Sequence, residues 1–263
     1  MRFLLVALVV AACNRAKSEP PQAAEPVRSL DLRKPVPQAL PETTTQLLTA
    51  VPADWNAVTA TLQLWHREKS AAWQRVGDPW TAVIGATGSA WGIGLHGDSL
   101  PIGRTGPLKQ EGDKKSPAGS FALRGAYGYA PNPPAGTRLP YTPTDDDTLC
   151  IDDPASLHYT TIVDKAATEL DWHSAEQMHR KDTLYTWVID VAHNPSHEPG
   201  NGSCIFLHVW KDAATPTVGC TAMPEDKLAR LLAELDPAQH PVFVLLPHDD
   251  YVALTAGWGL PAL

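Results

Sequence analysis

Short apolar segments, separated by glycine and proline, recur along the chain from residue 58 onward. In residues 58–65 (VTATLQLW) apolar and polar side chains alternate, with the period of two that is typical of a half-buried β-strand. Further strands are predicted at residues 72–76, 80–84, 121–123, 184–192, 204–210 and 242–246, and residues 77–79 (GDP) interrupt the first two of these. The glycines and prolines of residues 85–119 predict turns. The pattern predicts a mainly β fold.

Two segments favour helix, so the predicted class is mainly β with a few helices (α+β). Residues 165–182 have a helical composition. After Pro224, a helix is predicted because proline fits the first turn and acidic residues suit its N-terminus. Its apolar face would be formed by Leu228, Leu231, Leu232 and Leu235.

The N-terminus has the features of an export signal. Arg2 precedes a short apolar run, residues 3–10, that is too short to span a bilayer. Small residues and then Cys13 follow, and residues 10–13 (VAAC) resemble the lipobox of a bacterial lipoprotein signal. That resemblance implies cleavage after residue 12 and a diacylglyceryl group on Cys13. The alternative is an ordinary secretory signal with an incidental cysteine.

These features divide the chain into four parts. Residues 1–12 are predicted as signal peptide, and residues 13–50 as a lipidated N-terminus followed by a Pro- and Ala-rich linker. Residues 51–250 are predicted as the folded domain and residues 251–263 as a C-terminal tail. The protein is expected to be exported, periplasmic and anchored by its lipid to a bacterial membrane, with the inner and outer membranes left open.

Composition limits the class of partner. Hydrophobic residues make up 43% of the chain, which is enough for a sizeable core, while the formal net charge is -8. Proteins that bind nucleic acids need a basic face, so nucleic acid is not expected as a partner. Oligomeric state is not determined by these features.

The cysteine count is informative because exported proteins meet an oxidising compartment. The chain has Cys13, Cys150, Cys204 and Cys220. If Cys13 carries lipid, three cysteines remain, and an odd number leaves one thiol unpaired.

Residues 203–223 (SCIFLHVWKDAATPTVGCTAM) place a histidine at the end of a predicted strand, ahead of a Gly-Cys pair. A thiol is a good nucleophile when a nearby imidazole takes its proton, and the imidazole can return that proton to the leaving amine. Gly219 permits a tight turn before Cys220, where backbone N–H groups could form an oxyanion hole. On spacing alone, a buried structural thiol and a core histidine at His208 remain the simpler interpretation.

The same segment resembles the active-site motif of the L,D-transpeptidase (YkuD-like) catalytic domain, in which a strand-end His is followed by Ser/Thr-x-Gly-Cys. His208, Thr217, Gly219 and Cys220 match this motif. Residues 109–121 (KQEGDKKSPAGSF), 150–154 (CIDDP), 171–178 (DWHSAEQM) and 202–210 are similar to a lipoprotein-type branch of that family, and the likeness covers roughly residues 55–247.

The chain departs from the family pattern at two positions near the nucleophile. Val218 stands where many members have His, and Ala222 stands where many have Arg or Asn. The loop from His208 to Cys220 is also shorter than in the commonest members. These positions help to hold donor and acceptor peptides in the family, so transfer and hydrolysis both stay open.

The resemblance implies a β-sandwich catalytic domain that works without cofactor or metal on peptidoglycan stem peptides. Cys220 would attack the carbonyl between the third stem residue and a terminal D-amino acid, and an amine would take the acyl group from the thioester. The acyl acceptor and the third stem residue are not specified. One alternative is a carboxypeptidase or amidase on the same scaffold, and another is a non-catalytic wall-binding lipoprotein. A third is a zinc site formed by His208, Cys204 and Cys220, which no closely spaced ligand pair supports.

Three residues are candidates for contact with the substrate. Glu111 lies in a glycine-rich segment that either lines the cleft or forms a solvated turn. Asp152 is a candidate ligand for a substrate amine or carboxylate. Trp210 would lie on the same side of its strand as His208 and either forms a wall of the cleft or packs in the core.

A disulfide between Cys150 and Cys204 follows from the role given to Cys220. A nucleophile has to remain a thiol, and export exposes the other two cysteines to oxidation. Both of these cysteines flank predicted strand starts, so neighbouring strands would bring them within bridging distance.

Overall fold

The computed structural model describes residues 39–69 and 71–263, which fold around a mainly β framework, as predicted. The predicted signal peptide, Cys13 and most of the predicted linker lie outside these residues. In the described part of the chain, no helix combines the length and the apolar content that crossing a bilayer requires.

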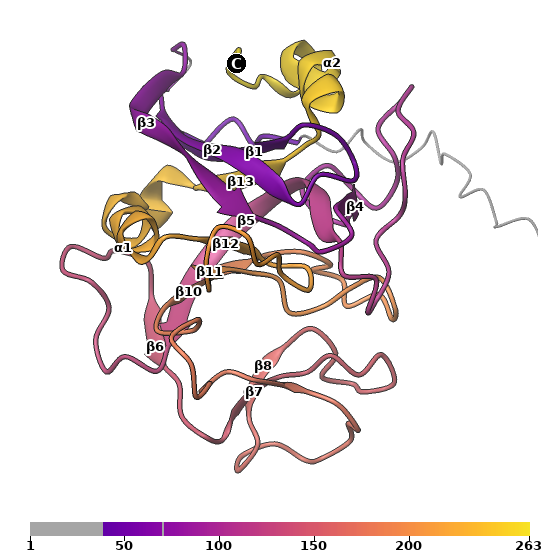
Figure 1. The fold of residues 1–263 in the computed structure, drawn as a ribbon, viewed down its shortest axis with the longest axis vertical. Helices are drawn as coiled ribbons and strands as arrows, with labels where there is room; N and C mark the ends of the chain where they lie inside the picture. Colours follow the sequence, from indigo (N-terminus) through magenta and orange to yellow (C-terminus); the bar gives the residue numbers. More distant parts are fainter. Residues whose placement is uncertain (1–38, 70) are drawn as a thin grey trace, which may run out of the picture. The chain divides into compact units, whose positions relative to one another are not determined.

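One large sheet of ten strands forms the framework (Figure 1). Its strands are β1 (Gln46–Pro52), β2 (Thr59–His66), β3 (Gln74–Val83), β4 (Ser89–Trp91), β5 (Ser116–Gly128), β6 (Tyr141–Pro143), β10 (Val188–Val191), β11 (Phe206–Val209), β12 (Thr221–Met223) and β13 (Val242–Leu245). The strand order is β10-β11-β12-β3-β2-β1-β13-β5-β4, with β6 beside β5.

Eight of these strands close on themselves, because β10 pairs with β5 as well as with β11. The closed set is barrel-like, and the sandwich implied by the family resemblance is not confirmed. Closure removes two exposed strand edges that an open sheet would have to protect. It also carries β11 and β12, the strands of the histidine–cysteine segment, into the middle of a continuous sheet.

Two α-helices pack on this sheet, α1 (Glu225–Glu234) and α2 (His248–Trp258). Helix α1 follows Pro224 as predicted, and its apolar face joins the main core through Leu228, Leu231 and Leu232. Helix α2 occupies most of the segment predicted as a tail. Tyr251 of α2 is fully buried and donates a hydrogen bond to the Pro261 carbonyl oxygen at 2.9 Å, so this segment belongs to the folded domain.

The folded domain also begins before the boundary predicted at residue 50. Strand β1 pairs in parallel with β13, where Leu47 is opposite Val242, and antiparallel with β2, where Leu47 is opposite Trp65. Leu47 and Leu48 are fully buried. The last residues of the predicted linker therefore form a central strand of the sheet.

The two strands predicted at residues 72–76 and 80–84 are one strand, β3. Its register against β2 shifts between the pairs Leu62–Trp80 and Leu64–Val76, so residues 77–79 form a bulge and the strand continues past it. At residues 77–79, β2 is the only described strand that lies beside β3, and the bulge interrupts the pairing there. The missing N–H of Pro79 therefore costs no hydrogen bond between strands.

The helix predicted over residues 165–182 is wrong. Local side-chain hydrogen bonds hold this segment in turns, a known alternative to helix for Asp and Thr. The Asp164 carboxylate accepts from the Ala166 N–H at 2.8 Å, and Asp171 accepts from Ser156 Oγ at 2.5 Å and from the Leu157 N–H at 2.8 Å. The end of the segment forms strand β9 (Glu176–Gln177) instead.

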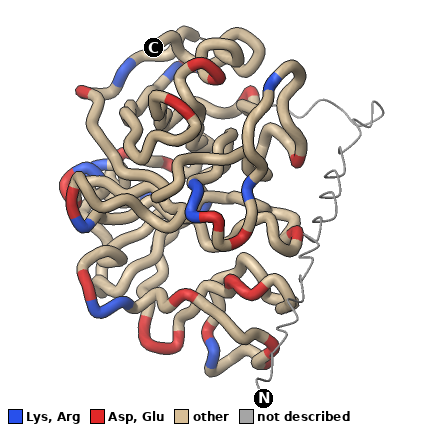
Figure 2. The backbone as a smooth tube through the Cα atoms, turned by 45° about the vertical axis from the view of Figure 1, so that its right-hand side comes forward, with Lys and Arg blue, Asp and Glu red and all other residues tan. Residues whose placement is uncertain are grey.

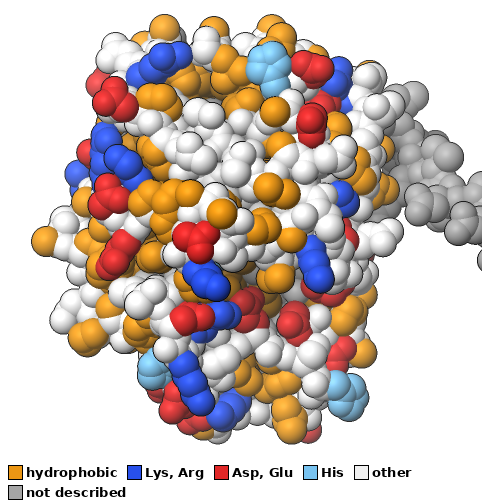
Figure 3. Space-filling view, in the orientation of Figure 1, with side chains coloured by type: hydrophobic (Ala, Val, Ile, Leu, Met, Phe, Trp, Pro, Cys, Tyr) orange, Lys and Arg blue, Asp and Glu red, His pale blue; other side chains and the backbone are white. Residues whose placement is uncertain are grey.

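Residues 145–182 form a cap that contains a small sheet with the order β8-β7-β9. Its strands are β7 (Thr148–Cys150), β8 (Ile162–Asp164) and β9. Figure 1 shows β7 and β8 beyond β10–β12, on the side away from β1–β3. Figure 2 shows many acidic residues along this part of the backbone, and on the face in Figure 3 basic and acidic side chains are interspersed.

Candidate active site

Cys220 lies immediately before β12 and is held through its own backbone. Its carbonyl oxygen accepts a hydrogen bond from Thr217 Oγ1 at 2.6 Å and lies 2.9 Å from Ser116 Oγ, on β5. Ser116 Oγ is also 2.7 Å from the Gly219 carbonyl oxygen. Two hydroxyls from separate segments therefore fix the backbone that carries the thiol.

Gly219 has the backbone conformation that the sequence suggested. Its φ of 148° is in the region that favours glycine, and a Cβ added there would lie 3.3 Å from the Lys115 carbonyl oxygen. The Gly219 N–H, however, donates to Thr217 Oγ1 at 3.1 Å. This N–H is therefore not free to serve in an oxyanion hole, so any such donor would have to come from another group.

His208 lies on β11, which runs parallel to β12 with His208 opposite Ala222. Because side chains alternate along strands, His208 and Cys220 project from the same face of the sheet. Leu207 and Val209 project from the other face into the main core. The histidine and the cysteine of the motif thus lie on the same face of two adjacent strands, the face that the cap covers.

The orientation of the His208 ring is set by one hydrogen bond. Its Nδ1 lies 2.7 Å from the carbonyl oxygen of Val209, which can only accept, so Nδ1 carries the proton. In the neutral ring Nε2 is then unprotonated and available to accept a proton.

The cap closes over the thiol. Cys220 is 4% exposed and packs in a cluster with Cys150 and Met178 of the cap and with Phe206 of β11. The Phe206 N–H donates to Cys220 Sγ at 3.3 Å, and Sγ is 3.6 Å from the Cys204 carbonyl oxygen.

Tyr185 and Glu176 belong to this site and were not predicted. The Tyr185 ring centroid lies 5.2 Å from that of His208, and its hydroxyl donates to Glu176 Oε1 at 2.5 Å. The side chain of Tyr185 also lowers the pKa of the Cys220 thiol. Glu176 is within residues 171–178, one of the segments that resembles the family, which was the available signal. Tyr185 stands in a predicted strand with nothing to distinguish it.

Burial sets the protonation of the site. It raises the pKa of Cys220 to about 12, and the charge of Glu176 adds to this effect. It lowers the pKa of His208 to about 4 and raises the pKa of Glu176. Proton transfer between an isolated pair with these pKa values is unfavourable by on the order of 10 kcal/mol. The thiol of Cys220 and the imidazole of His208 are therefore both neutral in the enclosed site.

This protonation state predicts an unusual pH dependence for alkylation of Cys220. Only the thiolate reacts, so the rate with iodoacetamide should rise about tenfold per pH unit from pH 7 to pH 10, without the plateau that an ordinary thiol shows near pH 9. Intact-mass measurement of the labelled fraction over time provides the rate, and Cys220→Ala provides the background. A plateau below pH 9 would contradict the buried, neutral thiol.

The three predicted substrate contacts have different outcomes. Glu111 accepts from Tyr159 Oη at 2.5 Å and from Ser203 Oγ at 2.6 Å, so it ties the 198–203 loop to the cap. Asp152 lies near Glu176 and raises its pKa, and its Oδ1 is buried without a hydrogen-bond partner among the described residues. Trp210 follows β11 and is half-buried, without a ring contact to His208 among the described residues.

Cys150 and Cys204 form a disulfide with a Cα–Cα distance of 6.0 Å, and Cys220 is free. The pair is the one that the sequence predicts. Because Cys204 is bonded to Cys150, it is not available as a zinc ligand beside His208 and Cys220. Among the described residues, no group of three His, Cys, Asp or Glu side chains has the arrangement of a metal site.

Comparison with known proteins adds no further assignment. No protein-family model matches the chain, and no curated protein matches it.

Proposed function

We propose that this protein is a cysteine acyltransferase of the L,D-transpeptidase kind that acts on peptidoglycan stem peptides. The observation that carries the proposal is that the free thiol of Cys220 and the imidazole of His208 lie on one face of the adjacent strands β11 and β12. The barrel-like sheet and its cap are proposed as this chain's form of the catalytic domain, in place of the expected sandwich. A thiol and an imidazole in this arrangement support acyl transfer through a thioester. The resemblance of residues 203–223 to the L,D-transpeptidase active-site motif supports the same reaction.

In the proposed first step, the Cys220 proton passes to His208 Nε2 as sulfur attacks the carbonyl carbon of the third stem residue. The C–N bond to the terminal D-amino acid then breaks, and the leaving amine takes the proton from His208. A thioester on Cys220 results. An amine attacks the thioester in the second step, loses a proton to His208, and leaves as the new amide while the thiol is restored.

The enclosed site has a consequence for this mechanism. Because the resting thiol and imidazole are both neutral, proton transfer has to accompany carbonyl attack, where the developing oxyanion can be stabilised. Peptide binding also has to displace part of the cap from Cys220, which is 4% exposed. Substrate-induced opening of the cap is therefore part of the proposal.

A hydrolase on the same scaffold is the second candidate. It shares the first step, and water replaces the amine in the second. Val218, which replaces the histidine found in many members of the family, is 72% exposed beside the nucleophile, so the acceptor side of this site differs from that of those members. The wall-binding alternative requires no reactivity at Cys220.

The proposed location follows from the N-terminal sequence. The signal peptide and lipobox support export to the periplasm, with the lipid on Cys13 holding the catalytic domain to a bacterial membrane. The partners proposed are therefore stem peptides and the membrane surface.

Incubation of the full-length chain in detergent with purified muropeptides should separate these functions. A transpeptidase yields cross-linked products or exchanges the terminal D-amino acid, whereas a hydrolase yields peptides shortened by that residue. Mass spectrometry of the products distinguishes them, and Cys220→Ala should yield neither. Muropeptides recovered unchanged from the wild-type chain would contradict both enzymatic proposals.

A further inference from the structure

The cap, residues 145–182, is attached to the barrel-like sheet without backbone pairing. Its strands β7, β8 and β9 pair with one another, and among the described residues no backbone hydrogen bond joins the cap to the large sheet. Side chains therefore make the attachment, and the cap can move away from the sheet without breaking the strand pairing of either part.

The strongest attachment lies directly over the nucleophile. Cys150 of β7 is bonded to Cys204, whose carbonyl oxygen is 3.6 Å from Cys220 Sγ. Glu176 of β9, which pairs with Cys150 across the small sheet, accepts a hydrogen bond from Tyr185 Oη at 2.5 Å. The disulfide and this hydrogen bond thus hold the same part of the cap against the thiol.

The other polar attachments of the cap are hydrogen bonds. Tyr159 Oη donates to Glu111 Oε2 at 2.5 Å, and Tyr129 Oη donates to the Asp182 carbonyl oxygen at 2.6 Å. Hydrogen bonds of this kind exchange with water when a segment opens locally. Among the described residues, the disulfide is the only side-chain attachment of the cap that has to be broken chemically.

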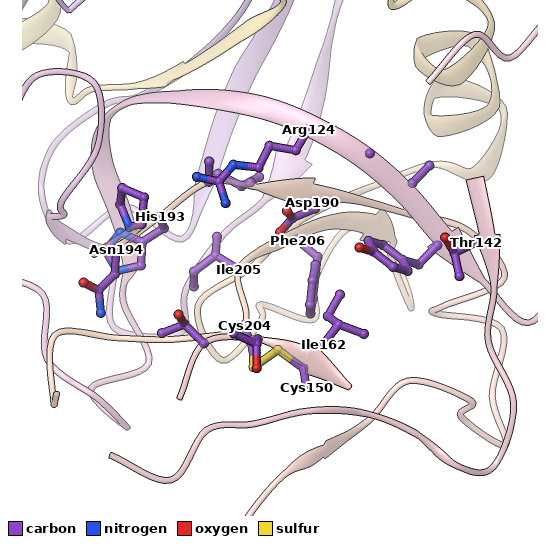
Figure 4. Close-up of a pocket in the computed structure, with 18 of the residues that line it drawn as sticks. Arg124, Thr142, Cys150, Ile162, Asp190, His193, Asn194, Cys204, Ile205 and Phe206 are labelled. Atoms are coloured by element: carbon purple, nitrogen blue, oxygen red, sulfur yellow. A yellow bond between two sulfur atoms is a disulfide. The ribbon is translucent and has the colours of Figure 1, made fainter. Parts of the chain in front are cut away.

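The disulfide can be reached from solvent through a cavity of about 310 Å³ between the sheet and the cap (Figure 4). Cys150 and Cys204 form part of its wall, and Figure 4 shows Arg124 and Asp190 on the β5–β10 side. His197 also lines the cavity and is exposed, so the cavity opens to solvent there. A small molecule can therefore enter beside the sulfur–sulfur bond.

Cys204 is the half of the disulfide that an incoming thiol meets. It is half-buried, whereas Cys150 is 1% exposed. Cys204 also has a φ of 52°, in the left-handed region that a non-glycine residue adopts only where its surroundings hold it. Loss of the bond to Cys150 removes one such constraint from the segment whose carbonyl group contacts Cys220.

We propose that the Cys150–Cys204 disulfide is a redox switch: a small thiol that enters the cavity reduces the bond, and the cap then opens and uncovers Cys220. The closed cap is the oxidised, inhibited form, and the open cap admits substrate to the thiol. The role of this switch in acyl transfer rests on the proposed function, whereas the uncovering of Cys220 does not.

Reduction proceeds in two exchanges. The thiolate of the small molecule attacks Cys204 Sγ, the Cys150–Cys204 bond breaks, and Cys150 leaves as a thiolate that takes up a proton. A second small thiolate attacks the sulfur of the first, which releases Cys204, so two small thiols become one disulfide and the protein gains two electrons. Acid quenching during reduction by 2-mercaptoethanol should trap the first adduct on Cys204. An adduct on Cys150 in its place would contradict the direction of attack.

The accessibility of Cys220 tests the switch without any substrate. The full-length chain in detergent is reduced with dithiothreitol, desalted without air and treated with iodoacetamide, and peptide mass spectrometry follows Cys220 separately from Cys150 and Cys204. Alkylation of Cys220 should be at least about tenfold faster than in the unreduced chain, which corresponds to about 1.4 kcal/mol in the opening equilibrium. Circular dichroism should show that the reduced chain is still folded.

Two variants separate opening of the cap from a general loss of stability. The Cys150→Ala, Cys204→Ala double variant should show the faster alkylation of Cys220 with or without dithiothreitol. Leu232→Ala is the matched control, because it leaves a void at a fully buried position of α1 in the main core and so destabilises the fold elsewhere. Alkylation of Cys220 should stay slow in this control.

Equal alkylation rates in the reduced and unreduced chains would overturn the switch. Acceleration in Leu232→Ala equal to that in the double variant would also overturn it, since Cys220 would then be exposed by general unfolding. A disulfide that dithiothreitol reduces only after the chain has unfolded would contradict access through the cavity.

Turnover tests the regulatory role separately. Release of the terminal D-amino acid from a stem tetrapeptide should have a kcat/KM at least about tenfold higher in the reduced chain than in the unreduced chain. Equal release by the two forms would leave the acyltransferase proposal intact and refute the switch. Faster alkylation with no release by either form would uphold the opening of the cap and refute the catalytic proposal.

Discussion

Cys220→Ala is expected to reduce kcat on stem peptides by at least about 10⁴-fold, because the sulfur forms the covalent intermediate and no other described thiol is free. His208→Ala is expected to have a similar effect, since the imidazole both accepts the thiol proton and protonates the leaving amine. Steady-state release of the terminal D-amino acid measures both variants. The two losses should not add in the double variant, because the residues act as a unit.

Two controls separate a chemical loss from a folding loss. Lys227→Ala, on the outer side of α1, should retain wild-type activity, since among the described residues the Lys227 side chain makes no contact closer than a long ion pair with Asp226 at 3.7 Å. Cys220→Ser preserves the size of the side chain but not the thiol, and it should be as inactive as Cys220→Ala. Activity near the wild-type level in Cys220→Ala or His208→Ala would refute their assigned roles.

Removal of the disulfide is expected to produce the largest loss of stability. The Cys150–Cys204 bond closes a loop with a sequence separation of 54, for which the chain-entropy relation predicts about 4 kcal/mol. For a domain of this size, that corresponds to a decrease in Tm of about 8–16 °C in the Cys150→Ala, Cys204→Ala double variant. Thermal unfolding followed by circular dichroism measures this change.

The same experiment has an internal control. A reducing agent should lower the Tm of the wild-type chain by a similar amount and should leave the double variant unchanged. Thiol counting on the denatured, unreduced protein should find Cys220 free in the wild type and in the double variant, with Cys13 blocked where it is lipidated. A Tm within about 2 °C of wild type, or a reactive Cys150 in the unreduced chain, would contradict the structural role of the bond.

Helices and strands that carry a local pattern of apolar residues could be predicted from the sequence. The leucine spacing after Pro224 predicts α1, and the alternation in residues 58–65 predicts β2, because each pattern reports one buried face. Strand β1 was hidden because its pairing is non-local: Leu47 finds its partner at Val242. Closure of the sheet depends on the β5–β10 pairing, which likewise leaves no local signature.

The candidate site likewise combines residues that a local motif identifies with residues that only the tertiary fold brings near. A local motif identified Cys220 and His208 as candidates, and the structure brings them to one face because β11 and β12 are adjacent and parallel. Glu176 reaches the site only because β9 pairs with β7 in the cap, at Cys150. The segment that carries Glu176 was predicted as helix from its composition. Arg124 and Asp190 come near each other because β10 pairs with β5 across a bulge, which spacing along the chain cannot indicate.

The most direct test of the proposed chemistry is to trap the acyl-enzyme. The full-length chain in detergent is mixed with a stem tetrapeptide, quenched in acid within the first turnovers and digested, and the peptide that contains Cys220 is analysed by mass spectrometry. The account predicts an added mass equal to the tripeptide acyl group, on Cys220 alone, which disappears with hydroxylamine and is absent from Cys220→Ala. Turnover with no adduct on Cys220, or an adduct on another residue, would contradict it.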